Sequence, residues 1–417
     1  MIADLFEEIQ KAKFLLKNVA LQTPFQRHQN LSEQFKANIY LKREDLQVIR
    51  SYKLRGAYNK ISNLSKIEQQ KGVICASAGN HSQGVAYSCA LLKIHGKIVM
   101  PITTPAQKVR QAQFFGKEFV QIILHGDTFD DAYKRAREIA EEEKLPFIHP
   151  FDDEKVIAGQ GTVGLEILEN TDVHLDYLFV PIGGGGLAAG ICTIFKHLSP
   201  LTKIIGVEPL GAPSMKKSIE AQENITLEQI DKFVDGASVK RVGDITFSIC
   251  KDYLFDVLLV PEGKVCSTIL QLYNEDAIVV EPAGALTIAA LSQYQSIIAG
   301  KNVACVVSGS NNDITRMEEI KERSLLYEGL KHYFIVRFPQ RPGALKEYVN
   351  EVLKPGMDIS YFQYAKKNNR EQGPTVVGIE LQQKEDFSLL ISSMEKNKIN
   401  FRYLNEDSDL YTHLIGF

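Results

Sequence analysis

The stretch "DYLFVPIGGGGLAAGICTIFKHL", residues 176–198, joins an apolar run to four consecutive glycines and then to a helical pattern. A nearly continuous apolar run indicates a strand buried on both faces, which is typical of parallel sheets. Glycines have no Cβ, so backbone N–H groups can approach a ligand closely, and at a helix start such groups bind phosphate. The stretch therefore predicts an α/β fold with an anion-binding loop.

The same alternation extends in both directions along the chain. Further apolar runs, separated by amphipathic helical patterns, lie at residues 72–77, 96–101, 118–124, 202–209 and 302–309. This order predicts an open parallel sheet covered by helices on both faces, arranged in two lobes. Residues 21–47 are expected to add an edge strand and to lead into the segment "RSYKLRGAYNK", residues 50–60.

Composition excludes several classes of protein. The 417 residues are 44% hydrophobic and carry a net charge of −3, which gives no reason to expect nucleic acid or an anionic membrane as a partner. No apolar run is long enough to span a bilayer, and the N-terminal pattern is that of an amphipathic helix rather than a signal peptide. The six cysteines form no CxxC pair and the nine histidines show no metal-ligand spacing. We therefore expect a cytoplasmic protein without a bound metal.

The pattern changes after a charged helical segment at residues 314–330. Strand and helix patterns then follow in the order βαββαβ, at residues 333–339, 343–354, 358–367, 375–383, 385–398 and 400–405. This order is that of a ferredoxin-like unit. We place the domain boundary after Tyr327, giving a first domain of residues 1–327 and a second of residues 328–417.

Two more loops follow strand patterns. "SAGNHSQG", residues 77–84, offers side-chain and backbone donors that suit a carboxylate, although Ser and Asn also cap helices without any ligand. "VVSGSNND", residues 306–313, ends a buried strand in small polar residues. Ligands of open α/β sheets gather at the carboxyl ends of the strands, where all of these loops fall.

A lysine, Lys53, stands beside Tyr52 and is followed by Gly56, which leaves room for another backbone. Together, this lysine, a phosphate loop, a carboxylate loop and the neutral Ser308 favour pyridoxal phosphate acting on an amino acid. A nicotinamide dinucleotide is the rival ligand, since the glycine loop fits G-x-G-x-x-[GA] and Glu208 ends the next strand. The dinucleotide would leave Lys53 unexplained.

These residues resemble the fold-type II (tryptophan synthase β-like) pyridoxal-phosphate enzymes, and most closely the threonine dehydratases, over residues 5–325. "SYKLRGA" is similar to the family's lysine motif, with Tyr52 where phenylalanine is usual. "SAGNHSQG", "GGGGL" and "SGSN" look like its substrate loop, phosphate loop and pyridine-nitrogen contact. Ser310 departs from the usual second glycine of the last motif.

The resemblance implies a role for each motif residue. Lys53 would form the Schiff base and, once freed, take the substrate Cα proton, for which an apolar pocket must lower its pKa. The implied cofactor contacts are Lys53, Tyr52, Asn80, Gly183, Gly184, Gly185, Gly186, Leu187 and Ser308. The implied substrate contacts are Ser77, Ala78, Gly79 and His81.

The implied reaction is elimination of the β-hydroxyl of L-threonine to give a 2-oxo acid and ammonia, with L-serine as a second candidate substrate. For threonine the 2-oxo acid is the 2-oxobutanoate used in isoleucine biosynthesis. Ser308 suits a lyase because a neutral hydroxyl does not enforce protonation of the pyridine nitrogen. The C-terminal unit, through "FPQRPGALKEYV", resembles the ACT-like domain of short biosynthetic threonine dehydratases. It implies feedback regulation by isoleucine, although a dimerisation domain with an empty pocket is an alternative. The resemblance also implies a homodimer or a homotetramer, without deciding between them.

Two other functions remain open from the sequence. A serine or threonine racemase on the same fold would need a second acid/base, but the matching position is Ala78, and the region after Glu208 and Pro209 lacks a second carboxylate for a divalent metal. A regulator that has lost catalysis is the alternative from another class. The intact Lys53 argues against it.

Overall fold

The computed structural model describes residues 2–339, 341–364, 372–407, 410–411 and 414. The chain divides into two compact units, Met1–Asp313 and Ile314–Phe417. None of the helices searched in the described part of the chain is both long and apolar enough to cross a bilayer. Among the same residues, no three His, Cys, Asp or Glu side chains gather in a way that would hold a metal ion.

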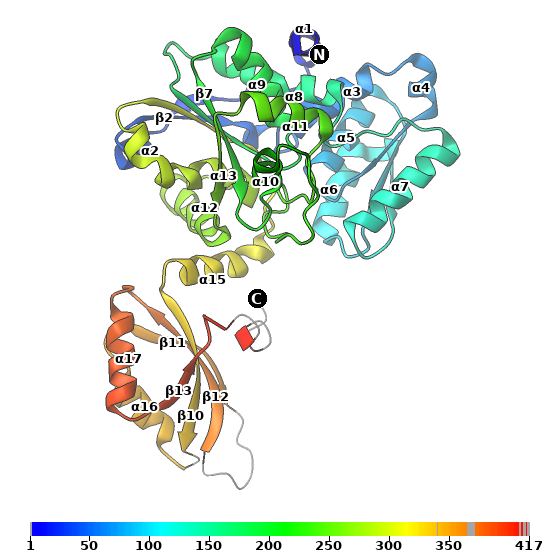
Figure 1. Ribbon diagram of the computed structural model, residues 1–417. Helices are drawn as coiled ribbons and strands as arrows, with labels where there is room; N and C mark the ends of the chain where they lie inside the picture. Colours follow the sequence, from blue (N-terminus) through cyan, green and yellow to red (C-terminus); the bar gives the residue numbers. More distant parts are fainter. Residues whose placement is uncertain (1, 340, 365–371, 408–409, 412–413, 415–417) are drawn as a thin grey trace. The chain divides into compact units, whose positions relative to one another are not determined.

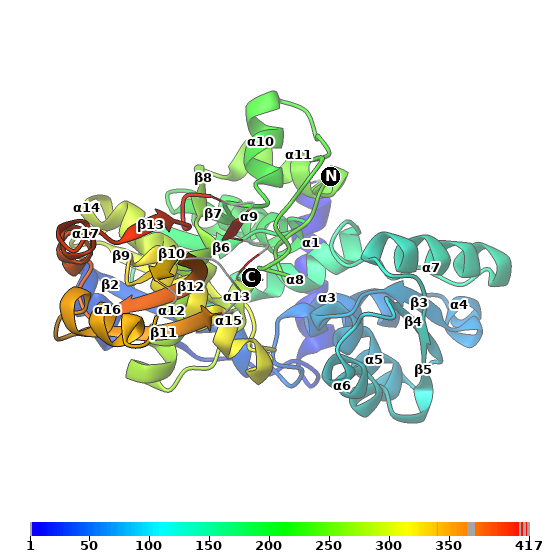
Figure 2. The ribbon, with the colours of Figure 1, turned by 90° about the horizontal axis from the view of Figure 1, so that it is seen from below.

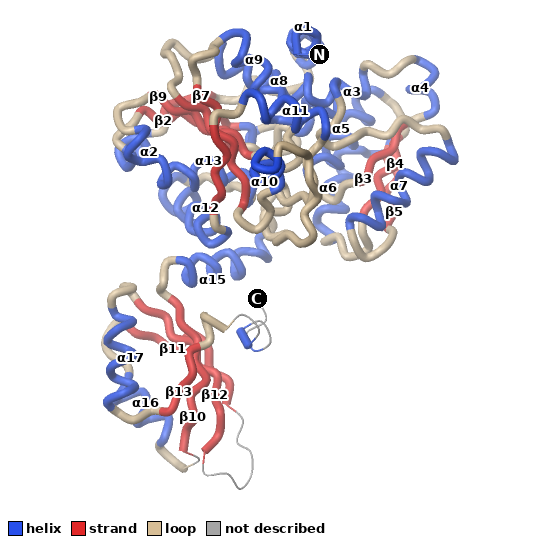
Figure 3. The backbone as a smooth tube through the Cα atoms, in the orientation of Figure 1, coloured by secondary structure: helices blue, strands red, loops and turns tan. Residues whose placement is uncertain are grey.

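The first unit contains two separate sheets, one in each of two lobes (Figures 1 and 3). The large lobe has six strands in the order β1 (Phe25–Arg27), β2 (Asn38–Arg43), β9 (Asn302–Val307), β6 (Tyr177–Pro181), β7 (Lys203–Pro209) and β8 (Asp256–Val260). The small lobe has three, in the order β3 (Val73–Ala76), β4 (Gly96–Met100) and β5 (Val120–Leu124). All neighbours are parallel except β1 and β2.

Helices cover both faces of each sheet. In the small lobe, α7 (Phe129–Glu143) lies on one face, and the other face carries α3 (Lys53–Ser62), α5 (Asn80–Leu92) and α6 (Ala106–Gly116) (Figure 2). In the large lobe, one face packs against α1 (Ile2–Leu16), α8 (Glu154–Glu169), α9 (Gly186–Leu198) and α11 (Asp244–Tyr253). The opposite face packs against α13 (Pro282–Ala289), which contacts α12 (Glu262–Asp276). The remaining helices are α2 (Gln29–Phe35), α4 (Lys66–Lys71), α10 (Ser214–Ala221) and α14 (Gln295–Ile298).

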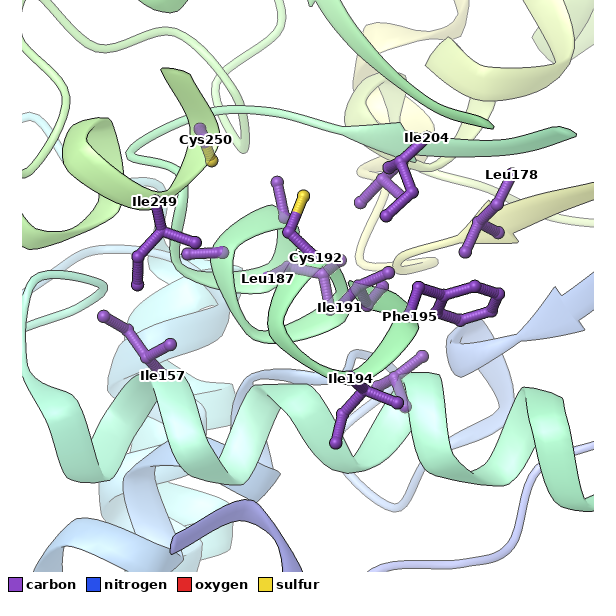
Figure 4. Close-up of a cluster of buried hydrophobic side chains, with 14 of the residues drawn as sticks. Ile157, Leu178, Leu187, Ile191, Cys192, Ile194, Phe195, Ile204, Ile249 and Cys250 are labelled. Carbon is purple, nitrogen blue, oxygen red and sulfur yellow. The ribbon is translucent and has the colours of Figure 1, made fainter. Parts of the chain in front are cut away.

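The helix after the glycine loop, α9, forms the centre of the large-lobe core. It is buried from Gly186 to Phe195, as expected for a helix that is apolar on every side. Its apolar side chains meet Ile157 of α8, Leu178 of β6 and Ile249 of α11 (Figure 4). Packing on all sides fixes the start of this helix, and therefore the loop before it.

The second unit has the ferredoxin-like topology that the sequence predicts. Its antiparallel strands stand in the order β11 (Met357–Tyr364), β12 (Gln372–Leu381), β10 (Lys331–Pro339) and β13 (Asn400–Tyr403), with helices α16 (Ala344–Val352) and α17 (Asp386–Lys396). Both helices pack on one face, over Phe334, Val336 and Val377. The end of the predicted strand 358–367, beyond Tyr364, lies outside the described residues.

The boundary between the two compact units follows Asp313, whereas the sequence analysis placed the domain boundary after Tyr327. The intervening helix, α15 (Met317–Tyr327), belongs to the second unit. The Glu322 carboxylate on this helix accepts hydrogen bonds from Lys331 Nζ and the Tyr333 hydroxyl, each 2.6 Å long. These buried bonds tie α15 to β10.

All six apolar runs that predict parallel strands are strands in the structure. The expected edge strand is β1, whereas β2 lies inside the sheet between β1 and β9. The sequence interpretation missed β8, the opposite edge of the sheet. Three of its five residues are only half-buried, although its run "DVLLV" is as apolar as the strands that the sequence did predict.

Candidate active site

One cavity lies where loops from both lobes meet, at the carboxyl ends of β3, β6 and β9. Its lining residues are Tyr52, Lys53, Asn80, Pro181, Gly183, Gly236, Ala237, Glu281, Ala283 and Ser308. Five of these were singled out from the sequence, and they come from four separate motifs. The structure therefore gathers the lysine, the two glycine-containing loops and the serine around one space.

Lys53 is the first residue of α3 and extends its side chain into this cavity. Its Nζ donates a 2.9 Å hydrogen bond to the backbone carbonyl oxygen of Pro150. Burial lowers the Lys53 pKa to about 8, although the carboxylate of Glu281 acts in the opposite direction. About half of the amine is thus neutral at a pH near 8, and the neutral form is the one that a nucleophile or a base requires.

Glycines bring the backbone of α3 close to two other helices. A Cβ on Gly56 would lie 2.8 Å from the carbonyl oxygen of Val156, and one on Gly159 would lie 2.4 Å from that of Arg55. On the α5 side, a Cβ on Gly84 would lie 3.0 Å from the carbonyl oxygen of Lys53 itself. The room that Gly56 leaves is therefore filled by α8, and this close packing fixes the position of Lys53.

The segment before Lys53 is attached to the end of β9. Ser51 pairs with Gly309, and the Tyr52 N–H donates to the Ser308 carbonyl oxygen over 3.3 Å. Ser308 is 3% exposed and lines the same cavity as Lys53. Ser310 directs its hydroxyl to the Asp45 carbonyl oxygen, 3.0 Å away. Replacing the usual glycine by Ser310 thus leaves Ser308 in its place.

The glycine loop is closely packed behind the cavity. A Cβ on Gly184 would lie 2.2 Å from the Phe151 ring, and a Cβ on Gly183 would lie 3.0 Å from Ala237 Cα. Gly185 has a φ of 93° and a Cβ there would lie 2.8 Å from Thr246. Both space and backbone conformation therefore require glycine, and the backbone itself forms this wall.

The N-terminus of α9 has no side-chain cap, although Gly185 occupies the N-cap position and Leu187 is buried in the first turn. The first N–H groups of a helix have no partners within the helix, so a ligand or water must satisfy them. The neighbouring helix α11 is different, because the Asp152 carboxylate accepts from the backbone N–H groups of Asp244 and Ile245, each 3.0 Å away. Of the two helix starts, only that of α9 is left for an anion.

The predicted carboxylate loop lies between β3 and α5. Gly79 is the N-cap of α5 without a side-chain cap, and a Cβ on it would meet nothing within 4 Å. The Ser77 hydroxyl accepts from the Gly79 N–H at 3.2 Å, while Ala78 is half-buried against the small-lobe core. This loop therefore offers backbone N–H groups to open space.

His81 directs its imidazole away from that space. The ring is 3% exposed and its Nε2 lies 2.9 Å from the Ile148 carbonyl oxygen. Burial, together with the charge of Lys53, lowers its pKa to about 3, so the ring is neutral. What His81 offers to a ligand is its backbone N–H in the first turn of α5.

Sequence reasoning missed a carboxylate in the cavity wall, Glu281, which is the N-cap of α13. Its Oε1 accepts a 2.7 Å hydrogen bond from Asn80 Nδ2. Burial and the charge of Asp235 raise its pKa to about 7, against the hydrogen bond from Asn80. A signal was present in the sequence, since "AIVVEPAGAL" ends an apolar run in Glu-Pro before a helix.

Comparison with known families covers nearly the whole chain. Residues 16–309 match the family described as "Pyridoxal-phosphate dependent enzyme", and residues 322–414 match the "C-terminal regulatory domain of Threonine dehydratase". Similar proteins named L-threonine dehydratase biosynthetic IlvA occur in Halalkalibacterium halodurans (57% identical) and Bacillus subtilis (58%). Each alignment spans 98% of this chain, and 99% and 97% of the relative, respectively.

Solved structures agree. Threonine deaminase isoform 2 from Solanum lycopersicum is 40% identical with a TM-score of 0.74, covering 78% of this chain and 89% of that one. Serine racemase from Dictyostelium discoideum is 31% identical with a TM-score of 0.68, covering 74% of this chain and 98% of the other. The racemase aligns with less of this chain than the relatives that match it from end to end. The chain belongs to the fold-type II pyridoxal-phosphate dependent enzymes and, among them, to the biosynthetic threonine dehydratases.

Proposed function

We infer that this chain is a pyridoxal-phosphate dependent threonine dehydratase, which converts L-threonine to 2-oxobutanoate and ammonia in isoleucine biosynthesis. The observation that carries this inference is the buried amine of Lys53, which faces a cavity bounded by the glycine loop and Ser308. Relatives that match the chain from end to end carry the same name.

The residues around the cavity fit the cofactor. Lys53 would hold it covalently through its amine, the N–H groups of Gly183 to Leu187 would bind its phosphate, and Ser308 would face its pyridine nitrogen. Tyr52 and Asn80 would bound the ring, with the Asn80 amide on the phenolic oxygen. When bound, the cofactor supplies an acceptor for the electrons released at the substrate Cα.

The protein's own groups supply the rest. A substrate carboxylate would bind the first-turn N–H groups of α5 with Ser77, so that Ala78, Gly79 and His81 contribute backbone rather than side-chain contacts. Lys53, with its pKa lowered to about 8, would accept the Cα proton. The β-hydroxyl then leaves with a proton as water, and the enamine product tautomerises to an imine, which is hydrolysed to the 2-oxo acid and ammonia.

Nothing in the cavity favours racemisation over elimination. The side chain of Ala78 is a methyl group and cannot carry a proton to the opposite face of Cα. We therefore propose elimination as the reaction, with threonine as the principal substrate, which the names of the relatives support, and serine as a slower one.

We further propose that the first compact unit acts as the catalytic domain and the second as the effector domain, so that α15, which the sequence analysis placed in a catalytic domain of residues 1–327, belongs with the effector residues 328–417. Isoleucine is the proposed inhibitor, as the match to the threonine dehydratase regulatory domain supports. A cytoplasmic location is supported by six cysteines that are all buried. We propose a homodimer or homotetramer as the assembly.

The direct test is release of 2-oxo acid by the purified chain loaded with pyridoxal phosphate. Threonine should be converted faster than serine, and isoleucine should inhibit. Formation of D-allothreonine from L-threonine, or of D-serine from L-serine, without 2-oxo acid would instead identify a racemase.

A further inference from the structure

We propose that Glu281 and Asn311 are positioning residues which fix the side-chain amide of Asn80, so that its nitrogen and not its oxygen faces the cofactor ring. The inference rests on the proposed function, which gives the Asn80 amide its ligand. Glu281 lies outside the motifs on which that function was built, and Asn311 ends the "SGSN" motif but was given no role in it.

The orientation of these amides is determined by a backbone carbonyl. Asn311 Nδ2 donates to the Ile49 carbonyl oxygen over 2.9 Å and to Asn80 Oδ1 over 2.6 Å. A backbone carbonyl only accepts, so the nitrogen of Asn311 must stand on this side. Asn80 must then present its oxygen to Asn311, which places its nitrogen on the opposite side.

The other end of the amide meets the Glu281 carboxylate. Asn80 Nδ2 donates to Glu281 Oε1 at 2.7 Å, and its second N–H is left for the cavity that Asn80 lines. The position of Glu281 is itself constrained, since its N–H donates to the Gly309 carbonyl oxygen at 3.1 Å. A Cβ on Gly309 would lie 2.5 Å from Glu281 Oε1, so this glycine makes the space for the carboxylate.

Charges around Glu281 come from several elements. Asp235 and Lys108, which form a 2.6 Å ion pair with each other, act on it from the loop before α11 and from α6, and Lys53 acts from α3. Burial dominates and raises the Glu281 pKa to about 7. Whether it is ionised or protonated, Glu281 keeps an oxygen that can accept from Asn80, so the hydrogen bond between the two side chains persists in both forms.

Without its hydrogen bonds to Glu281 and Asn311, the Asn80 amide could rotate and present its oxygen to the phenolic oxygen of the cofactor ring. Two acceptors would then face each other, and the cofactor would lose a donor that tunes its electronic state. The signature of this loss is spectroscopic and requires no substrate.

The experiment compares Glu281→Ala, Glu281→Gln and Asn311→Ala in the cofactor-loaded protein. Glu281→Ala and Asn311→Ala should each shift the visible absorption band of the lysine-linked cofactor and lower kcat by about tenfold, as expected for loss of one hydrogen bond to a charged group. Glu281→Gln retains an acceptor oxygen, so its absorption band should lie where it does in the unmodified protein, and its kcat should be within about threefold of the unmodified value. Glu262→Ala is the matched control, because it removes a partly buried carboxylate that accepts from the Gly211 N–H at 2.8 Å outside the cavity. It should leave the band unchanged.

Two results would overturn the proposal. An unshifted band in Glu281→Ala would mean that the carboxylate does not control the amide. A Glu281→Gln variant as slow as Glu281→Ala, with an unchanged band in both, would mean that Glu281 transfers a proton and does not act by positioning. Failure of the proposed function would differ from either result, because the unmodified protein would then release no 2-oxo acid.

Discussion

The amine of Lys53 donates a 2.9 Å hydrogen bond to the carbonyl oxygen of Pro150, a residue 97 positions further along the chain. The carbonyl satisfies one hydrogen of the amine and leaves the nitrogen lone pair for a ligand once the ammonium has lost its proton. The cost of burial that lowers the Lys53 pKa therefore also prepares the nitrogen to react.

Replacing this lysine should abolish the reaction without unfolding the protein. Lys53→Ala removes both the covalent attachment and the base, so kcat should fall by more than about 10³-fold, beyond the loss typical of one acid/base group. Lys60→Ala is the control on the same helix, where the lysine forms a 2.6 Å ion pair with Asp153. It should retain activity. A Lys53→Ala variant with a tenth of the original kcat would remove Lys53 from its role.

The rate at which the cofactor-free protein captures pyridoxal phosphate should depend on pH. The folded pKa of Lys53 is depressed to about 8, and only the neutral amine attacks an aldehyde. Capture should therefore quicken as pH rises toward about 8 and level off above it. Stopped-flow absorbance measures this rate. A rate that keeps rising to the pKa of an exposed lysine would show that burial does not tune this amine.

The same shift has a consequence for stability. Because the unfolded lysine binds its proton more tightly than the folded one, the cofactor-free protein should gain stability as pH rises from about 8 toward 10.5, the ordinary pKa of a lysine side chain. Urea unfolding at several pH values, compared with Lys53→Met, isolates this contribution. Equal pH dependence in the two proteins would contradict it.

The glycine loop offers a test with an internal control. Gly185 and Gly300 both have positive φ, but a Cβ on Gly185 would meet Thr246, whereas one on Gly300 would meet nothing within 4 Å. Both Gly→Ala variants should lose about 1–2 kcal/mol of stability from the strained backbone. Gly185→Ala should in addition weaken cofactor binding, measured by equilibrium titration. Unchanged affinity in that variant would place the phosphate elsewhere.

Breaking the buried ion network of Arg55, two residues after Lys53, should lower the stability of the protein strongly. Arg55, 1% exposed, bonds to Glu44 at 2.8 Å and to Glu166 at 2.6 Å. Arg55→Leu leaves both carboxylates without this partner and should cost about 3–5 kcal/mol in urea unfolding. Arg135→Leu, which breaks a half-exposed pair with Glu138, should cost less than about 1 kcal/mol. Similar losses of unfolding free energy in the two variants would contradict this prediction.

Truncation tests regulation and the boundary together. A protein that ends at Asp313 should remain active and lose isoleucine inhibition, because an effector acts only through a site that it binds. One that ends at Tyr327 should be less soluble, since α15 keeps Glu322 but loses Lys331 and Tyr333. Full isoleucine inhibition in the shorter protein would place the effector site in the first unit.

The sequence predicts most of the fold because the buried strands are nearly continuous apolar runs. It fails where the evidence is tertiary, as in the attachment of α15 through Glu322, whereas the strand Asp256–Val260 was missed although its own residues form an apolar run. The glycine loop and Lys53 are visible as local patterns. The bonds from Asn80 to Glu281 and from Asn311 to Asn80 are not, because they join residues 201 and 231 positions apart.

The most direct test of the central claim is to map the cofactor on the protein. The loaded protein should be reduced with borohydride, digested and analysed by peptide mass spectrometry, with 2-oxo acid release from threonine measured before and after reduction. We expect the reduced cofactor on the peptide that contains Lys53, together with loss of activity in proportion to labelling. Labelling of a different lysine, or full labelling of Lys53 with activity retained, would contradict the account.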